Sequence, residues 1–166
     1  PHRDQVGVPR HDGKHQVKDI RSGSASSNLF FLTSVNGTLY FRADDGASGS
    51  ELWKSDGTAD GTVMVRDIRP GSAGSGPHHL ANFNGTLFFF AYDGVHGDEL
   101  WRSDGTTEGT VMVKDIPGGG AAVNSYDQNM AVANDTLFFV AFDEVNGREL
   151  WKSDGTSEGT VLVKDI

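Results

Sequence analysis

Residues 51–68 read ELWKSDGTADGTVMVRDI, and nearly the same eighteen residues return at 99–116 as ELWRSDGTTEGTVMVKDI and at 149–166 as ELWKSDGTSEGTVLVKDI. Repeats with a period of about 40 to 50 residues are typical of helical-pair arrays or of four-stranded propeller blades. The types of residue inside each repeat distinguish between these two architectures. Four copies of the closing V-[KR]-D-I, spaced by 48, 48 and 50 residues, end at Ile20, Ile68, Ile116 and Ile166.

The middle copy contains four short segments separated by turn residues: HHLANFNG, TLFFFAYDG, GDELWRSDG and GTVMVKDI. They are rich in β-branched and aromatic residues, Gly interrupts each stretch that resembles a helix, and no long apolar pattern of helical period is present. We therefore expect four strands in each unit and no helix. The second segment is apolar on both alternating faces, which predicts that sheets cover it on both sides, as in stacked propeller blades.

Turn chemistry supports the same interpretation. The pairs Asn36-Gly37 and Asn84-Gly85 favour the positive φ angles of a tight hairpin between the first two strands, and Asn134 begins a weaker variant. Each of these Asn also begins an N-x-T sequon, so a surface glycan is the alternative role. In the SDGTxxGT motif an Asp can bond backbone amides two residues further on. The three Asp of this motif are Asp56, Asp104 and Asp154.

These patterns predict an all-β fold: a β-propeller-like array of four-stranded antiparallel blades, with about three full blades and a partial one. We expect propellers to close with about four to eight blades, so this array would leave two blade faces bare. Self-association, or the remaining blades of a longer chain, would cover them. The expected division is 1–20 as a degenerate partial repeat that supplies an outer strand, 21–68 as blade 1, 69–116 as blade 2 and 117–166 as blade 3.

Composition narrows the possible partners. The chain has 14 Lys and Arg against 23 Asp and Glu, a formal charge of −9, which repels phosphate backbones and anionic lipid. We therefore expect neither nucleic acid nor a membrane span, and no apolar run approaches the length of about 18 residues that a spanning helix needs. The absence of Cys excludes disulfides, thiolate metal sites and a Cys nucleophile. A start at Pro1 without a signal-like segment favours a processed product or a fragment.

The repeat resembles a named bacterial family, the ELWxxDGT repeat, whose consensus ELWxxDGTxxGTxxVxDI all three full copies match. The resemblance covers residues 21–166. It implies a propeller-like repeat of large exported bacterial proteins, and hence a secreted or cell-surface location, but it brings no established catalytic residue or ligand. The stretch that ends at Ile20 departs from the family because no ELW precedes it.

Carboxylates gather in two sets of loops that are expected to leave the blades on the same side: those between the second and third strands, and those leading to the next blade. Ca²⁺ accepts about six to eight oxygen ligands in loose geometry, so these acids are candidate calcium ligands, although none has the D-x-D-x-D-G spacing. The alternative is that they are solvated or bond their own turns. The candidate calcium ligands are Asp44, Asp45, Asp93 and Asp143.

In each ELW the Leu and Trp side chains point to opposite faces of the strand. We therefore expect Trp53, Trp101 and Trp151 to pack in the core. Stacking on a sugar ring is the alternative role for these repeated aromatics. The pair His78-His79 and the single His96 each occur in only one copy of the repeat, and no nucleophile motif such as GxSxG is present.

We therefore expect a non-catalytic scaffold that binds a glycan, or another cell-surface or matrix ligand, through its loop face. Repeat scaffolds place recognition in variable loops, and the loops between copies differ strongly here. The rival hypothesis is a propeller-type hydrolase or lyase with a site in the acidic loops and the unrepeated histidines. Candidate ligand-binding residues are Asp45, Asp93, His96, Asp143, Trp53, Trp101 and Trp151.

Overall fold

The computed structural model describes residues 16–118 and 130–165. Within these ranges there are three four-stranded antiparallel sheets, one for each full copy of the repeat, and no helix. The expected all-β fold with four strands in each unit is confirmed. The same ranges hold no helix long and apolar enough to cross a membrane.

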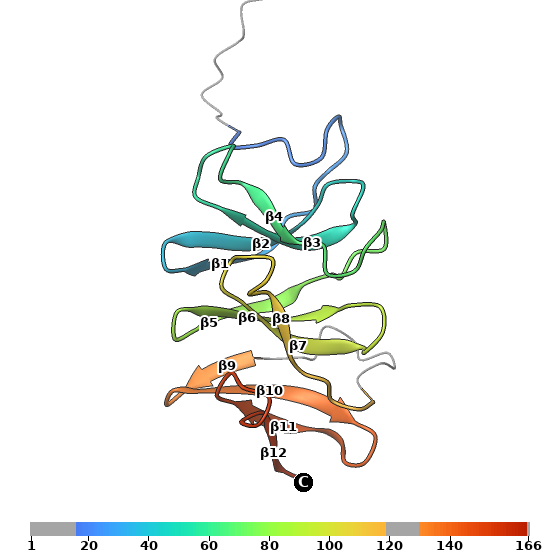
Figure 1. The fold of residues 1–166 in the computed structure, drawn as a ribbon, viewed down its shortest axis with the longest axis vertical. Helices are drawn as coiled ribbons and strands as arrows, with labels where there is room; N and C mark the ends of the chain where they lie inside the picture. Colours follow the sequence, from blue (N-terminus) through green and yellow to red (C-terminus); the bar gives the residue numbers. More distant parts are fainter. Residues whose placement is uncertain (1–15, 119–129, 166) are drawn as a thin grey trace, which may run out of the picture.

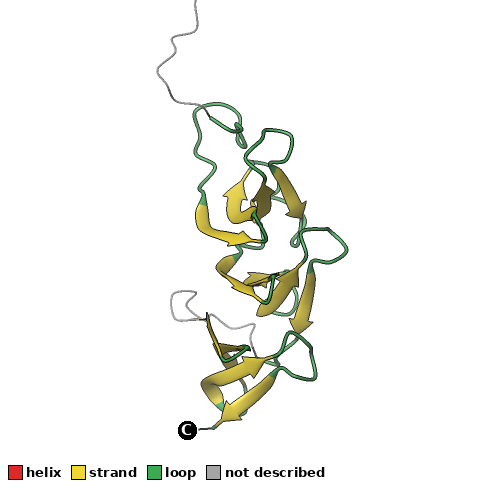
Figure 2. Cartoon of the chain, turned by 90° about the vertical axis from the view of Figure 1, so that its left-hand side faces the viewer, coloured by secondary structure: helices red, strands yellow, loops and turns green. Residues whose placement is uncertain are grey.

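The sheets follow one another in a row, in chain order (Figure 1), and the view at right angles shows the same succession (Figure 2). Neighbouring sheets contact each other through their first strands. The described strands do not close the row into a ring. The first sheet consists of β1 (Phe30–Val35), β2 (Thr38–Asp44), β3 (Ser50–Ser55) and β4 (Val63–Arg66); the second of β5 (His78–Phe83), β6 (Thr86–Tyr92), β7 (Asp98–Ser103) and β8 (Val111–Lys114); the third of β9 (Met130–Ala133), β10 (Thr136–Asp143), β11 (Gly147–Ser153) and β12 (Val161–Lys164).

The hairpins between the first two strands of each sheet are built as the Asn pairs predict. Asn36 and Gly37 have φ angles of 50° and 81°, and the weaker pair Asn134 and Asp135 has 48° and 54°. Positive φ at both central residues is the requirement of the type I′ turn, which matches the twist of the two strands. The turn therefore sets the register in which β1 pairs with β2 and β9 with β10.

Burial of the second strand depends on its place in the row. All five residues from Leu87 to Ala91 in β6 are buried, because the first and third sheets cover both faces of the second sheet. In β10 burial alternates, with Leu137 and Phe139 buried and Phe138 partly exposed. The predicted cover on both faces is thus found for the middle sheet, and one face of the third sheet is open.

In the first and second sheets, a cation at the end of the last strand joins that sheet to the next one. Arg66 donates to the backbone carbonyl of Thr110, and Lys114 donates to that of Thr160 at 2.7 Å. Lys18 makes the same contact with Thr62 at 2.7 Å. The V-K-D-I at 17–20 therefore takes the position on the first sheet that the end of a preceding sheet would take.

Of the segment 1–20, which was expected to supply an outer strand, the structure describes residues 16–20. Residues 16–20 belong to no strand, although Ile20 packs on the first sheet beside Phe41 and Trp53. The remainder of the expected partial repeat, 1–15, lies outside the described residues.

Candidate binding surface

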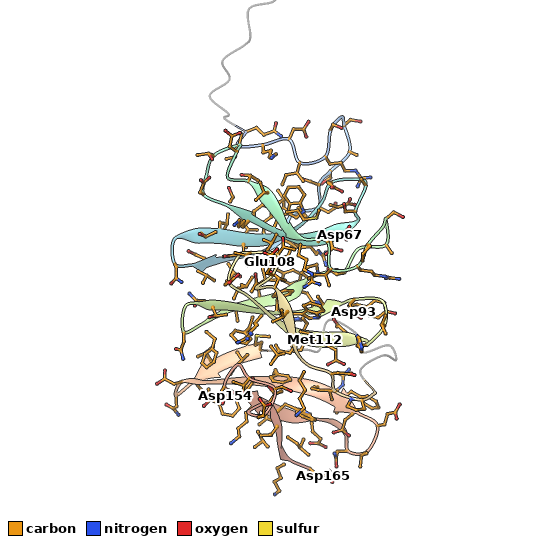
Figure 3. All side chains as sticks on the ribbon, viewed as in Figure 1. Asp67, Asp93, Glu108, Met112, Asp154 and Asp165 are labelled. Carbon is orange, nitrogen blue, oxygen red and sulfur yellow. The ribbon has the colours of Figure 1, made fainter. Side chains whose placement is uncertain are left out.

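The acidic turns lie on one side of the row, together with the loops that lead from sheet to sheet. Figure 3 labels Asp67 and Asp93 on this side. Backbone hydrogen bonds join the two sets of loops, from Tyr92 N to Ser75 O at 3.0 Å and from Glu144 N to Pro117 O at 3.2 Å. The expectation that both sets emerge on the same side is confirmed.

Within these turns each predicted acid bonds its own backbone. One oxygen of Asp45 accepts from the amides of Ala47 and Ser48, both at 2.8 Å. Asp93 accepts in the same way from the amides of residues 95 and 96, and Asp143 from those of residues 145 and 146. These bonds favour the ionised acid: the amide of Ser48 lowers the pKa of Asp45.

The second carboxylate oxygen of each of these acids is also engaged. The side chain three residues further on, at the same place in every copy, supplies a donor to it. In the second sheet this donor is His96, whose Nδ1 lies 2.6 Å from Asp93 Oδ2. The hydrogen bond that His96 donates to Asp93 raises the pKa of His96. The other two donors are Ser48 and Asn146.

Asp44 also accepts from a backbone amide of its turn, that of Gly46 at 2.7 Å, and its other oxygen pairs with Arg21 at 2.7 Å. Tyr92 takes the place of Asp44 in the second sheet, and there Arg69 lies over the ring at 4.7 Å. The structure thus puts the candidate calcium ligands in equivalent turns of three separate sheets. Residues 16–118 and 130–165 contain no group of three or more acids or histidines that could hold a metal ion.

The three repeated Trp are core residues. Trp53, Trp101 and Trp151 are 7%, 5% and 8% exposed. Leu100 and Trp101 belong to different core clusters, so the side chains of an ELW strand face opposite sheets, as predicted. Burial leaves no free ring face on these Trp, which corrects their candidate role in stacking on a sugar.

The histidine pair lies at the start of β5. His78 is buried, with Nε2 3.2 Å from Asp98 Oδ2, and its ring stacks on Phe90 with centroids 5.8 Å apart. His79 has a φ of 51°, and Phe31, at the same place in β1, has 58°. The register of both strands shifts at these residues, so each forms a bulge. Bulges and positive φ at residues other than Gly often mark functional sites.

An apolar surface beside this bulge was not foreseen as a site. Leu29, Phe30, Phe31 and Leu32 are 51%, 49%, 39% and 64% exposed, and the guanidinium of Arg42 lies over the Phe30 ring at 4.7 Å. We call these five residues the β1 patch. The Phe31 ring lies 5.9 Å from that of His79, so the patch adjoins the second sheet. The apolar run LFFL at 29–32, where the first variable loop leads into β1, was the available signal.

The Glu of the first two ELW strands is buried, and neither residue was predicted to have a role. Glu51 accepts hydrogen bonds from the amides of Ile68, Arg69 and Ser75, and from the Ser75 hydroxyl. Glu99 accepts from the amide of Ile116, and its Oε1 has no hydrogen-bond partner among the described residues. Burial, together with nearby acids, raises the pKa of Glu99 to about 8.

Comparison of the chain with models of protein families, with curated proteins and with solved structures finds no match.

Proposed function

We propose that this chain is a non-catalytic, β-propeller-like repeat module of an exported bacterial protein of the ELWxxDGT type. It binds a glycan, or another cell-surface or matrix ligand, through side chains that its repeated framework holds in place. The observation that carries the proposal is the β1 patch, where four consecutive apolar side chains stay exposed at the start of β1 beside a cation. Contiguous exposed apolar surface of this kind marks interaction sites in soluble proteins.

The repeated residues support a scaffold role. Leu52, Leu100, Trp101 and Trp151 are buried between sheets, and Trp53 is buried on the first sheet beside Ile20. The repeated acids of the turns bond their own backbone. The framework thus uses most of its own polar groups. The residues left over for a partner come from the variable loops and from the first strands that follow them.

The chemistry of the β1 patch fits a sugar. Phe30 and Phe31 present rings that are partly exposed, and Arg42 and His79 lie beside them as polar groups. Aromatic rings stack on the apolar face of a sugar, while cationic and imidazole donors bond its hydroxyls. This chemistry supports a ligand position at the first strands and not at the acidic turns.

Binding of the full chain to a panel of immobilised glycans and matrix components tests the proposal. We expect Phe30→Ala to weaken binding by about tenfold or more, because it removes a central aromatic contact. The matched control is Val95→Ala, which truncates a 79% exposed side chain at the tip of the β6–β7 turn. Absence of binding across the panel, or equal effects of the two variants, would overturn the proposal.

A propeller-type hydrolase or lyase is the second candidate, and the observation that favours it is the unrepeated histidine pair. Asp98 lies 3.2 Å from His78, and burial lowers the pKa of His79, which keeps that imidazole neutral and able to accept a proton. Turnover of polysaccharide, ester or phosphate substrates that is lost in His79→Ala would favour the enzyme. Turnover unchanged in that variant, or no turnover, would exclude this site.

A further inference from the structure

The third sheet ends the row with an uncovered apolar face. Leu150 is 39% exposed, whereas its counterparts Leu52 and Leu100 are both 0% exposed. Val163 is 43% exposed, and its counterpart Val113 is 7% exposed. The difference arises from position alone, because the next sheet covers these side chains in the first two copies.

The two internal interfaces show what covers such a face. An aromatic side chain of one sheet lies against the Gly of the SDG turn in the next, Tyr40 against Gly105 and Phe88 against Gly155. A Cβ at Gly155 would lie 3.0 Å from the Phe88 ring, and a Cβ at Gly105 would overlap the Tyr40 hydroxyl. A cation beside the aromatic donates to the carbonyl of the same Gly, as Lys54 does to Gly105 at 2.8 Å.

The third sheet offers the same groups with nothing to receive them. Phe138 stands where Tyr40 and Phe88 stand in the other sheets, and it is partly exposed. Lys152 and Lys164 correspond to the two interface cations of the earlier sheets. In the described residues no following sheet supplies their acceptors.

The first sheet carries the matching receptors. Nothing lies within 4 Å of a Cβ built at Gly57, the counterpart of Gly105 and Gly155, so the place for an aromatic ring is open. The carbonyl of Thr62 accepts from Lys18, which belongs to the V-K-D-I at 17–20. The same four residues, V-K-D-I, end the third copy at 163–166.

We propose that the third sheet of one copy docks, head to tail, on the first sheet of a second copy. Phe138 then lies on Gly57, Lys152 donates to the carbonyl of Gly57, and Lys164 replaces Lys18 on the carbonyl of Thr62. Residues 17–20 occupy part of the receiving surface and must leave it for docking. The inference is independent of any ligand, because it uses only contacts that the chain already makes twice within itself.

Sedimentation velocity of the full chain over a range of micromolar concentrations tests the docking, with two variants that each disable one end. Leu150→Asp puts a charge on the bare face of the third sheet. Ala59→Arg puts a large side chain on an exposed turn of the first sheet, at the position where Thr107 bonds the preceding sheet through Val65 O at 2.9 Å. Both replaced residues are exposed, and circular dichroism verifies that each variant keeps the all-β fold.

We expect the unaltered chain to self-associate and each variant alone to associate at least about tenfold more weakly. An equimolar mixture of the two variants should form a dimer and nothing larger, because one intact end of each kind remains. Val145→Asp is the control, since Val145 is 90% exposed at the β10–β11 turn, away from both faces. A monomer at all concentrations would overturn the proposal, and so would association of Ala59→Arg with itself at full strength, which indicates another surface.

Discussion

The carboxylate of Glu51 holds the loop that leads from the first sheet to the second. It accepts from three backbone amides and one hydroxyl, and it is 0% exposed. Buried carboxylates need such donors, because an ion removed from water without them is costly. The Glu of ELW is thus repeated because its carboxylate accepts hydrogen bonds from backbone amides in the loop between one sheet and the next.

Glu99 predicts a pH dependence of stability. Burial raises its pKa from 4.5 to about 8, so between these values the folded protein holds a proton that the unfolded chain has released. The free energy of unfolding should therefore fall as pH rises from 5 to 8, on the order of 1 kcal/mol per pH unit at the steepest point. Glu99→Gln should flatten this decline, as measured by urea unfolding across the pH range.

The matched control for that prediction is Glu149→Gln, at the same place in the third sheet, where the side chain is partly exposed. It should leave the decline in place. If both variants gave the slope of the unaltered chain, burial of Glu99 would not be the source of the pH dependence.

The turn acids lead to an expectation about Ca²⁺. The carboxylate of Asp143 accepts from two backbone amides and from the side chain of Asn146, and the Asn146 bond lowers its pKa. A calcium ion would have to compete with these donors for Asp143, and the described ranges 16–118 and 130–165 gather no three acids or histidines that could hold it. We expect excess Ca²⁺ or a chelator to move Tm by less than about 1 °C, because only ligands with useful affinity for the folded state raise stability. A clear rise with Ca²⁺, lost in Asp143→Ala, would contradict this expectation.

Individual turn residues were predictable, but their second contacts were not. Asn36-Gly37 and the Asp of SDGT have local partners within a few residues, so the sequence defines their geometry. Whether an acid is free to bind a metal depends on which side chain lies three residues further on. Here Ser48, His96 and Asn146 differ in type and serve the same purpose, which hides the pattern in the sequence.

At the level of strands and turns, the Gly of SDG serves two interactions at once. Its φ of about 90° suits the turn between the last two strands, and this role was predicted from the motif. The contact of Gly105 with Tyr40 of the preceding sheet was not predicted, because no local sequence pattern shows which turn lies against the neighbouring sheet. The bulges at Phe31 and His79 were missed for a similar reason, since they depend on how β1 and β5 pair with the strands that follow them.

Substitution of two equivalent Gly residues distinguishes the backbone strain of the turn from the contact between neighbouring sheets. Gly57→Ala should cost about 1–2 kcal/mol through backbone strain alone, because the space around it is open. Gly105→Ala has the same strain and also meets the Tyr40 hydroxyl, so we expect a further loss of about 1–3 kcal/mol. Urea unfolding of both variants measures the difference.

Tyr40→Phe in the Gly105→Ala background is the accompanying test, since it removes the atom that a Cβ would meet. It should recover part of the additional loss. Equal destabilisation by Gly57→Ala and Gly105→Ala would show that Tyr40 does not press on this turn.

Across the whole molecule, the burial of equivalent residues depends on the position of their sheet in the row. The period and the two-sided apolar strand predicted stacked four-stranded sheets and the side on which the acidic turns lie. They did not distinguish the copies, because the framework of the third sheet has nearly the sequence of the second. Only the arrangement in space shows that Leu100 is covered and Leu150 is not. The β1 patch likewise depends on the absence of cover over β1, which composition does not reveal.

This gradient of cover predicts a gradient of local stability. In repeat arrays each unit is stabilised mainly by its neighbours, so a sheet with one neighbour opens more readily than a sheet with two. We expect amide hydrogens of β6 and β7 to exchange most slowly and those of β10 and β11 faster, as measured by hydrogen exchange with mass spectrometry. Docking of a second copy should slow exchange in β10 and β11 as concentration rises, with little change in β6. Equal protection of the second and third sheets at low concentration would contradict the gradient, because it would mean that an open face costs the third sheet nothing.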